Sequence, residues 1–215
     1  MNIGQIKQKV RMLGKNYFGT DADRDPFGLD YLIIESANQI ARQTDCLVGR
    51  RKLSVVAGEA DYCSPDLYKI RVIKILSQAG NYGKIRIYNY SDQMIDYWRN
   101  AGSQLVPDVA VIRGMNAITL LPTPLEAITD GLLVEGFCIP GDYWEYDTNG
   151  NPIVNSDTSE CPLPVVGHDC LVFLVLYNRA MQMMDANGMA IFNKEYLERL
   201  GQLESYAATY ARRTV

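Results

Sequence analysis

The spacing of apolar residues changes twice along this chain, and the change limits the folds open to it. Apolar residues recur at steps of three and four up to Thr44, alternate with polar residues between positions 51 and 140, and return to helical steps from Val165 onward. With 215 residues, 47% of them apolar, the chain is long enough to bury a substantial core. We therefore predict an α+β fold, in which a helical bundle scaffold carries an inserted antiparallel β domain and a projecting β-hairpin.

The predicted boundaries follow the same changes of spacing. We expect the helical scaffold to comprise residues 1–49 and 161–215, and the inserted β domain to comprise residues 50–140. Residues 141–160 form an acidic segment between them. Its Asn149-Gly150 pair lies between two β-prone runs, and such a pair is a strong short-range signal for a hairpin.

Helices are predicted at Ile3–Leu13 and at residues 29–44, 165–185 and 191–212. We expect Ala186-Asn187-Gly188 to end the third helix, because glycine is common just past a helix C-terminus. The fourth helix has a narrow apolar seam that suits packing on a neighbouring helix. The seam consists of Phe192, Tyr196, Leu200, Leu203, Ala207 and Tyr210.

The β domain is predicted as short strands separated by turns. Residues 69–75 alternate but change phase at Val72-Ile73, which indicates a β-bulge. Asn81-Tyr82-Gly83 is predicted as a turn before a single strand at residues 84–88, and Gly114-Met115-Asn116 as the turn between two later strands. Ser91 is expected to cap a short helix that carries Tyr97 and Trp98.

The charge of the chain is unevenly distributed. The net charge is -4, which argues against a protein that coats duplex nucleic acid. Residues 50–86 nevertheless contain only three acidic residues, whereas residues 141–160 contain five acidic residues and no Lys or Arg. Opposed poles favour head-to-tail contact between copies, although solvated surfaces produce the same counts. The basic residues between positions 50 and 86 are Arg50, Arg51, Lys52, Lys69, Arg71, Lys74, Lys84 and Arg86.

Composition also indicates where the protein is made. The N-terminus has no signal-peptide pattern, and the longest apolar run, residues 170–177, is far shorter than a membrane span. We therefore expect synthesis in a reducing cytoplasm and no membrane association. The five cysteines include no CxxC pair, so buried free thiols are expected.

No motif for catalysis or cofactor binding is apparent, and we expect no catalytic, cofactor or metal site. His168 is the sole histidine, so a Cys-His mechanism would require it to act with a thiol such as Cys170. Cys161, His168 and Cys170 lack a fourth ligand and the usual zinc spacing. Residues 147–158 resemble a calcium loop, but Pro152 and Thr158 replace its required Gly and Glu. Neither a Walker loop nor a GxGxxG motif is present.

The order of several short motifs resembles that of a known protein family. Each motif is structural, and together they extend over nearly the whole chain. They are Ile40-Ala41-Arg42, Gly58-Glu59-Ala60-Asp61-Tyr62, Ile70 and Val72, Tyr97-Trp98, Pro107, Ile118-Thr119-Leu120-Leu121-Pro122-Thr123-Pro124, the segment 137–140, and Pro162-Leu163-Pro164. In this order the chain resembles the head-to-tail adaptor (connector) proteins of tailed bacteriophages, the group that includes tail tubular protein A.

The resemblance implies a structural virion protein at the head-tail interface, made in the host cytoplasm. Its expected partners are further copies in a ring, dodecameric in this family, the portal protein above and a tail or nozzle protein below. Genomic DNA would pass through the ring without sequence-specific binding. The interface residues expected on this basis are Trp144, Tyr146 and Ile153 in the hairpin, and Tyr206, Tyr210, Arg212 and Arg213 toward the portal.

Three alternatives stay open at this stage. The first is a nucleic-acid-binding module that uses the basic β segment and its tyrosines. The second is another neck or tail-completion ring protein of the same architecture. The third is a small enzyme that acts through His168 and Cys170, which requires a reactive thiol at near-neutral pH.

Overall fold

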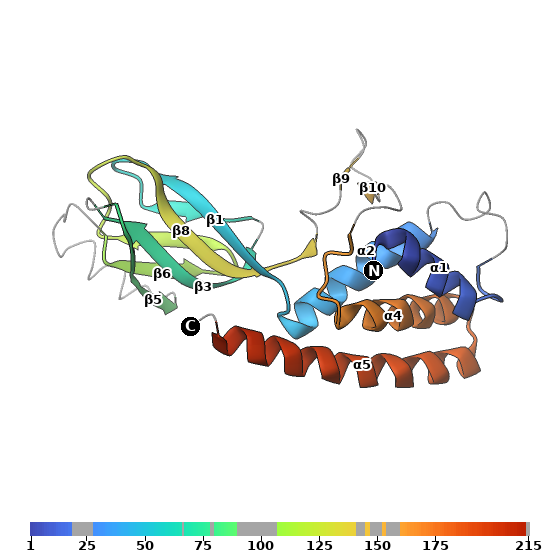
Figure 1. The fold of residues 1–215 in the computed structure, drawn as a ribbon. Helices are drawn as coiled ribbons and strands as arrows, with labels where there is room; N and C mark the ends of the chain where they lie inside the picture. Colours follow the sequence, from blue (N-terminus) through green and yellow to red (C-terminus); the bar gives the residue numbers. More distant parts are fainter. Residues whose placement is uncertain are drawn as a thin grey trace. The chain divides into compact units, whose positions relative to one another are not determined.

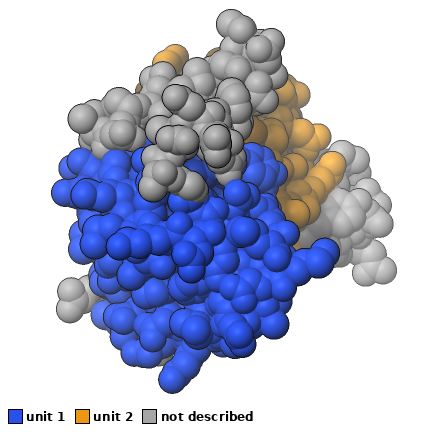
Figure 2. All heavy atoms as spheres, turned by 90° about the vertical axis from the view of Figure 1, so that its right-hand side faces the viewer, with its two compact units in different colours: residues 1–47, 139–215 blue, residues 48–138 orange. Residues whose placement is uncertain are grey.

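The chain divides into two compact units, each of which is described here by itself. The structure is a computed structural model, and it describes residues 1–18, 28–65, 67–77, 80–89, 107–140, 145–146, 152–153 and 160–213. Unit 1 comprises Met1–Leu47 and Ile139–Val215, and unit 2 is Val48–Cys138 (Figures 1 and 2). The predicted boundaries at 49/50 and 140/141 lie two residues from these junctions. Helices and strands are both abundant, which confirms the α+β class.

The described part of unit 1 contains the helices α1 (Ile3–Leu13), α2 (Gly28–Thr44), α4 (Gly167–Gln182) and α5 (Ala186–Arg213). The side chain of Asn2 accepts a hydrogen bond from the Gln5 backbone, and the Gln5 side chain accepts one from the Asn2 backbone. This reciprocal capping box satisfies two donors at the helix end, so α1 begins where its apolar spacing begins. The helix Ile3–Leu13 matches the prediction residue for residue.

Helix α4 forms the centre of unit 1. It packs against α1, α2 and α5 (Figure 1), and most of its side chains are therefore buried. Its fully buried residues include Leu171, Val172 and Val175. Because a helix that is apolar on most sides needs neighbours on most sides, α4 holds the other three helices in place.

The predicted end of the third helix is wrong. Helix α4 stops at Gln182, and Met184 adopts the left-handed conformation (φ 56°) that glycine was expected to supply. The backbone N–H groups of Asn187 and Gly188 instead donate to the Asp185 carboxylate, so these residues begin α5. Gly188 lies against the Tyr17 hydroxyl, which a Cβ at this position would crowd.

The described part of unit 2 contains two four-stranded sheets. One sheet has the order β1-β8-β3-β4, formed by β1 (Val48–Val55), β8 (Ile128–Cys138), β3 (Leu67–Leu76) and β4 (Tyr82–Lys84). The other has the order β2-β7-β6-β5, formed by β2 (Asp61–Cys63), β7 (Ala117–Leu121), β6 (Val109–Arg113) and β5 (Arg86–Asn89). All pairs are antiparallel except β5 with β6, which is parallel.

The turns of unit 2 agree with the sequence in one place and differ in another. The turn at Gly114 (φ 67°) joins β6 to β7 as predicted. The strand expected at residues 84–88 is in fact two strands, because β4 pairs with β3 in one sheet and β5 pairs with β6 in the other. The chain changes sheets at Ile85, and Tyr82 already lies in a strand, so the tight turn precedes it at Gly80.

The predicted bulge in β3 is present, slightly earlier than expected. The register of β3 with β8 shifts between Ile70 and Val72, and a second shift lies between Leu67 and Lys69. A bulge moves all later side chains to the opposite face of the sheet. This shift places Lys69, Val72 and Lys74 opposite Phe137, Glu135 and Leu133, which are alternate residues of β8.

The acidic segment contains the predicted antiparallel pair. Strand β9 (Glu145–Tyr146) pairs with β10 (Pro152–Ile153), with Tyr146 opposite Pro152. The short helix expected after Ser91 lies outside the described residues. No helix in the described part of the chain is long and apolar enough to cross a membrane.

Candidate interaction surfaces

The outer side of α5 is the first candidate surface. Tyr206 and Tyr210 are 40% and 45% exposed, and their rings stack in nearly parallel planes with centroids 6.3 Å apart. Nearer the start of the helix, Ile191 is 61% exposed and Leu197 is 54% exposed. Four large side chains along α5 are therefore at least 40% exposed.

The inner seam of α5 is narrower than predicted. Tyr196, Leu203 and Ala207 are buried. Phe192 and Leu200 are only partly buried, and Tyr210, which was expected in the seam, is 45% exposed. Burial raises the pKa of Tyr196 to about 12, and its hydroxyl donates a hydrogen bond to the Gln43 side chain. The buried side of α5 is thus fixed to α2 by a polar contact as well as by packing.

For the other predicted interface residues, the structure describes the backbone of some and nothing of Trp144. Tyr146 and Ile153 lie on β9 and β10, where Ile153 is opposite Glu145. Arg212 and Arg213 are the last residues of α5, and nothing is described of their side chains. Trp144 lies outside the described residues. Among these candidates, only Tyr206 and Tyr210 have a described side-chain environment.

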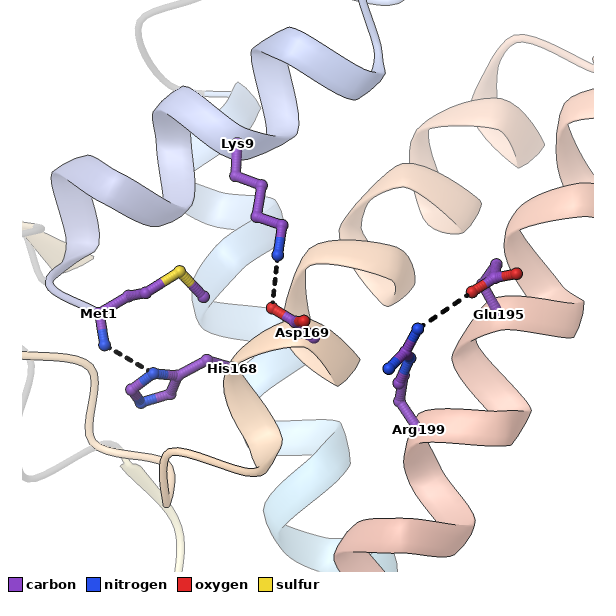
Figure 3. A network of polar contacts seen from close by, with 6 residues as sticks. All are labelled: Met1, Lys9, His168, Asp169, Glu195 and Arg199. Atoms are coloured by element: carbon purple, nitrogen blue, oxygen red, sulfur yellow. Dashed lines mark hydrogen bonds and ion pairs between the residues drawn. The ribbon is translucent and has the colours of Figure 1, made fainter.

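His168 lies in the first turn of α4 and is buried. Its Nε2 is 3.0 Å from the Leu163 carbonyl and its Nδ1 is 2.7 Å from the Met1 amino group (Figure 3). A neutral ring that donates from Nε2 and accepts at Nδ1 satisfies both contacts. Burial, and secondarily the positive charge of Met1, lowers the pKa of His168. These contacts join three segments of unit 1 and engage both ring nitrogens.

The cysteines are mostly buried thiols, as predicted, with one exception. Cys46, Cys138, Cys161 and Cys170 are buried, whereas Cys63 on β2 is exposed. Burial raises the pKa of Cys161 to about 11 and that of Cys170 to about 12. A thiol with such a pKa carries almost no thiolate at neutral pH, which opposes nucleophilic chemistry at Cys170. The described residues contain no cluster of three or more His, Cys, Asp or Glu side chains that could hold a metal ion.

The second candidate surface is one face of the β1-β8-β3-β4 sheet, which we call the basic sheet face. Glu135 and Phe137 are alternate residues of β8 and so point to the same side. Lys74 Nζ lies 2.7 Å, and Arg50 Nε 3.5 Å, from Glu135 Oε1. The charged groups of Lys69 and Arg71 lie 5.3 Å and 5.0 Å from the centre of the Phe137 ring.

Two more cations lie on the same face. Lys52 is opposite Leu133, the next residue of β8 on this side, and Lys84 is directly opposite Lys74. Lys52 Nζ is 3.8 Å from Asp130 Oδ2. The basic sheet face therefore consists of Arg50, Lys52, Lys69, Arg71, Lys74 and Lys84, with Glu135 buried among them. The sequence shows the excess of basic residues. It does not show that they lie on one side of the sheet, because their placement depends on the bulge in β3.

Comparison with known proteins provides no relative for either surface. No protein-family model matches the chain, and a search of curated proteins finds no significant match.

Proposed function

We propose that this chain is the head-to-tail adaptor of a tailed bacteriophage, a structural subunit that forms a ring below the portal. The proposal rests on the order of motifs noted in the sequence. The observation that supports it most directly is the outer side of α5. Tyr206 and Tyr210 stack on each other while 40% and 45% exposed, and tyrosines are enriched at interfaces between proteins.

The distribution of charge suits repeated contact between copies. Unit 1 carries 11 basic and 16 acidic residues, whereas unit 2 carries ten basic and nine acidic residues. Head-to-tail interfaces use two different patches of one subunit, and they form a ring when the rotation closes. An acidic unit and a basic face on the same chain supply two complementary patches that help to set the orientation of neighbours.

The adaptor would extend the DNA channel and offer a docking surface to the next tail or nozzle protein. An acidic wall around the channel would repel phosphate, so that DNA slides through without sequence-specific binding. We propose that the end of α5 contacts the portal and that the 141–160 hairpin contacts a neighbouring copy or a tail protein.

The portal contact is tested by shortening the chain. Truncation after Thr209 removes Tyr210, Arg212 and Arg213 together, and we expect it to abolish co-sedimentation with the portal protein encoded by the same genome. Circular dichroism should show an intact fold. The control is Met12→Ala, which removes an exposed apolar side chain from α1 and should leave docking unchanged. Unimpaired docking of the truncated chain would contradict the proposed contact.

The hairpin contact needs a separate variant. We expect Trp144→Ala combined with Tyr146→Ala to weaken ring assembly or tail attachment, because large aromatic side chains supply much of the binding energy at interfaces. Native mass spectrometry of the portal complex would count the bound copies. An unchanged count together with unchanged tail attachment would remove the hairpin from the interface.

A further inference from the structure

An open slot in unit 2 lies between strands β1 and β2. Leu53 and Val56 line it on the β1 side, Asp61 and Cys63 line it on the β2 side, and its volume is about 580 Å³. The two strands follow each other in the chain but belong to different sheets, and each is the end strand of its sheet in the described part of unit 2. The slot therefore lies where the chain passes from one sheet to the other.

One edge of β2 carries backbone groups that its neighbour β7 does not use. The Leu120 N–H donates to the Ala60 carbonyl at 2.8 Å, and the Ser64 N–H donates at 3.0 Å to a carbonyl just before β7. Antiparallel neighbours bond to each other at every second residue, so the N–H and C=O groups of Asp61 and Cys63 point away from β7. Because β2 ends its sheet in the described part of the chain, these groups are available to a further strand.

We propose that this slot accepts an extended, basic segment of a partner protein, which adds to the edge of β2 as a further strand. Main-chain hydrogen bonds to Asp61 and Cys63 supply affinity, and the fit of alternate side chains supplies specificity. Leu53 and Val56 suit apolar side chains at the positions between the basic ones. This binding uses unit 2 alone, goes beyond ring assembly, and does not depend on whether the chain forms a ring.

The charge of the slot favours a basic segment. The described residues that line it include Glu59 and Asp61 but no Lys or Arg. Thr119 donates to Asp61 Oδ1 at 2.5 Å, and an Arg113 nitrogen lies 3.9 Å from the same oxygen. The Asp61 side chain is nevertheless 63% exposed, and Glu59 is exposed as well. A Lys or Arg on the added strand therefore gains an opposite-charge pair across the strands, whereas a phosphate or an acidic peptide is repelled.

The first test is binding of the purified full chain to a fluorescein-labelled hexapeptide of alternating lysine and valine, measured by fluorescence anisotropy at low salt. We expect Glu59→Gln combined with Asp61→Asn to weaken binding about tenfold, because two opposite-charge pairs are lost. The matched control, Asp108→Asn combined with Glu198→Gln, should leave binding unchanged, since these exposed residues do not line the slot. Absence of binding, or equal binding of a hexapeptide of alternating glutamate and valine, would overturn the proposal.

The second test separates strand addition from attraction by charge alone. In an added strand, the N–H groups of alternate residues bond to the edge of β2, while those between them point away. A hexapeptide N-methylated at its lysines and one N-methylated at its valines should therefore differ in affinity by about tenfold, because only one of them loses hydrogen bonds to the edge. Equal affinities of the two peptides would rule out strand addition.

The third test places the binding in the slot. Cys63 is exposed whereas the other four cysteines are buried, so N-ethylmaleimide should alkylate Cys63 selectively. The bulky group should abolish peptide binding, and the same treatment of Cys63→Ser should leave binding unchanged. Unimpaired binding after complete alkylation would contradict the location. A dimer that forms without peptide and dissociates on alkylation would assign the slot to a second copy of the chain and would also overturn the proposal.

Discussion

The two units place their charged side chains differently. In unit 1, Lys9 pairs with Asp169 at 2.7 Å and joins α1 to α4 (Figure 3). Lys7 pairs with Asp30 at 2.8 Å and joins α1 to α2. In unit 2, like charges gather on one face around the buried Glu135. A helix distributes successive residues around its axis, whereas a strand sends alternate residues to one side. Alternation, together with the bulge in β3, therefore places basic side chains from β1, β3 and β4 on one surface.

The largest expected effect concerns the core of unit 1. Leu171→Ala removes a fully buried side chain from α4, which packs on three other helices, and should lower the free energy of unfolding by about 3 kcal/mol. Urea unfolding followed by far-UV circular dichroism measures the change. The control Val165→Ala alters a mostly exposed residue and should change stability by less than about 0.5 kcal/mol. Equal losses would mean that α4 is not the centre of unit 1.

Unit 1 was also the easier unit to predict. Both ends of helix α1 could be predicted from the sequence. Its apolar spacing begins where its cap, Asn2 with Gln5, begins. The start of α5 was missed, because Asn187-Gly188 is equally compatible with a helix end until the Asp185 carboxylate is seen to cap both N–H groups. Spacing indicates the buried face of a helix, but local sequence carries no signal for a long-range contact such as that of Gly188 with Tyr17.

Unit 2 depends more on contacts between distant residues. Alternation predicted a strand through residues 84–88, but alternation carries no information about which sheet each half joins. The basic sheet face could not be predicted from the sequence for a similar reason. The bulge between Ile70 and Val72 determines that Lys69 and Lys74 lie on the same side of the sheet. Of the candidate interface, sequence could indicate the tyrosines of α5 but not which of them face outward.

The second prediction tests the close approach of two strands in unit 2. A Cβ added to Gly136 would lie 2.4 Å from the Lys69 carbonyl oxygen, so Gly136→Ala forces β8 and β3 apart. We expect a loss of about 2 kcal/mol in urea unfolding. Gly83→Ala on β4 is the matched control, because its Cβ would meet nothing within 4 Å. If both substitutions cost the same, the packing of β8 on β3 does not limit the sheet.

The third prediction addresses the charges of unit 2 directly. Glu135→Gln leaves Lys74 and Arg50 without their shared carboxylate and should cost about 2 kcal/mol. This value lies between those for buried and exposed pairs, because the side chain of Glu135 is 9% exposed but that of Arg50 is 66% exposed. Asp130→Asn should cost less than about 0.5 kcal/mol, because Asp130 and Lys52 are both exposed. Chemical denaturation measures both losses of stability, and equal losses would contradict this account of the charges.

A smaller effect is expected at the turn between α4 and α5. Met184 has a φ of 56°, which is unfavourable for any residue with a Cβ, so Met184→Gly should stabilise the protein by about 0.5–1 kcal/mol. The neighbouring Met183 has a φ of -88°, and Met183→Gly should instead destabilise it. Thermal unfolding of the two variants should shift in opposite directions. A shift in the same direction would refute this account of the turn.

The smallest expected effect is a pH dependence confined to unit 1. The pKa of His168 is lowered by burial and then by Met1, while the Leu163 carbonyl and Asp169 act in the opposite direction. The unfolded chain then binds protons more readily, so the stability present above the ordinary pKa of 6.5 is lost as the pH falls below it. Comparison of unfolding midpoints for the wild type and His168→Gln measures this loss. If the unfolding midpoint falls equally with pH in the wild type and in His168→Gln, His168 is not the source of the pH dependence.

The central claim is that this chain assembles on the portal, and cryo-electron microscopy of the two proteins together tests it most directly. The portal protein encoded by the same genome would be mixed with an excess of the purified chain. The account predicts class averages in which a closed ring of this chain, with α5 ends toward the portal, lies against one face of the portal. Bare portal particles, with the chain monomeric in the same grids, would contradict it.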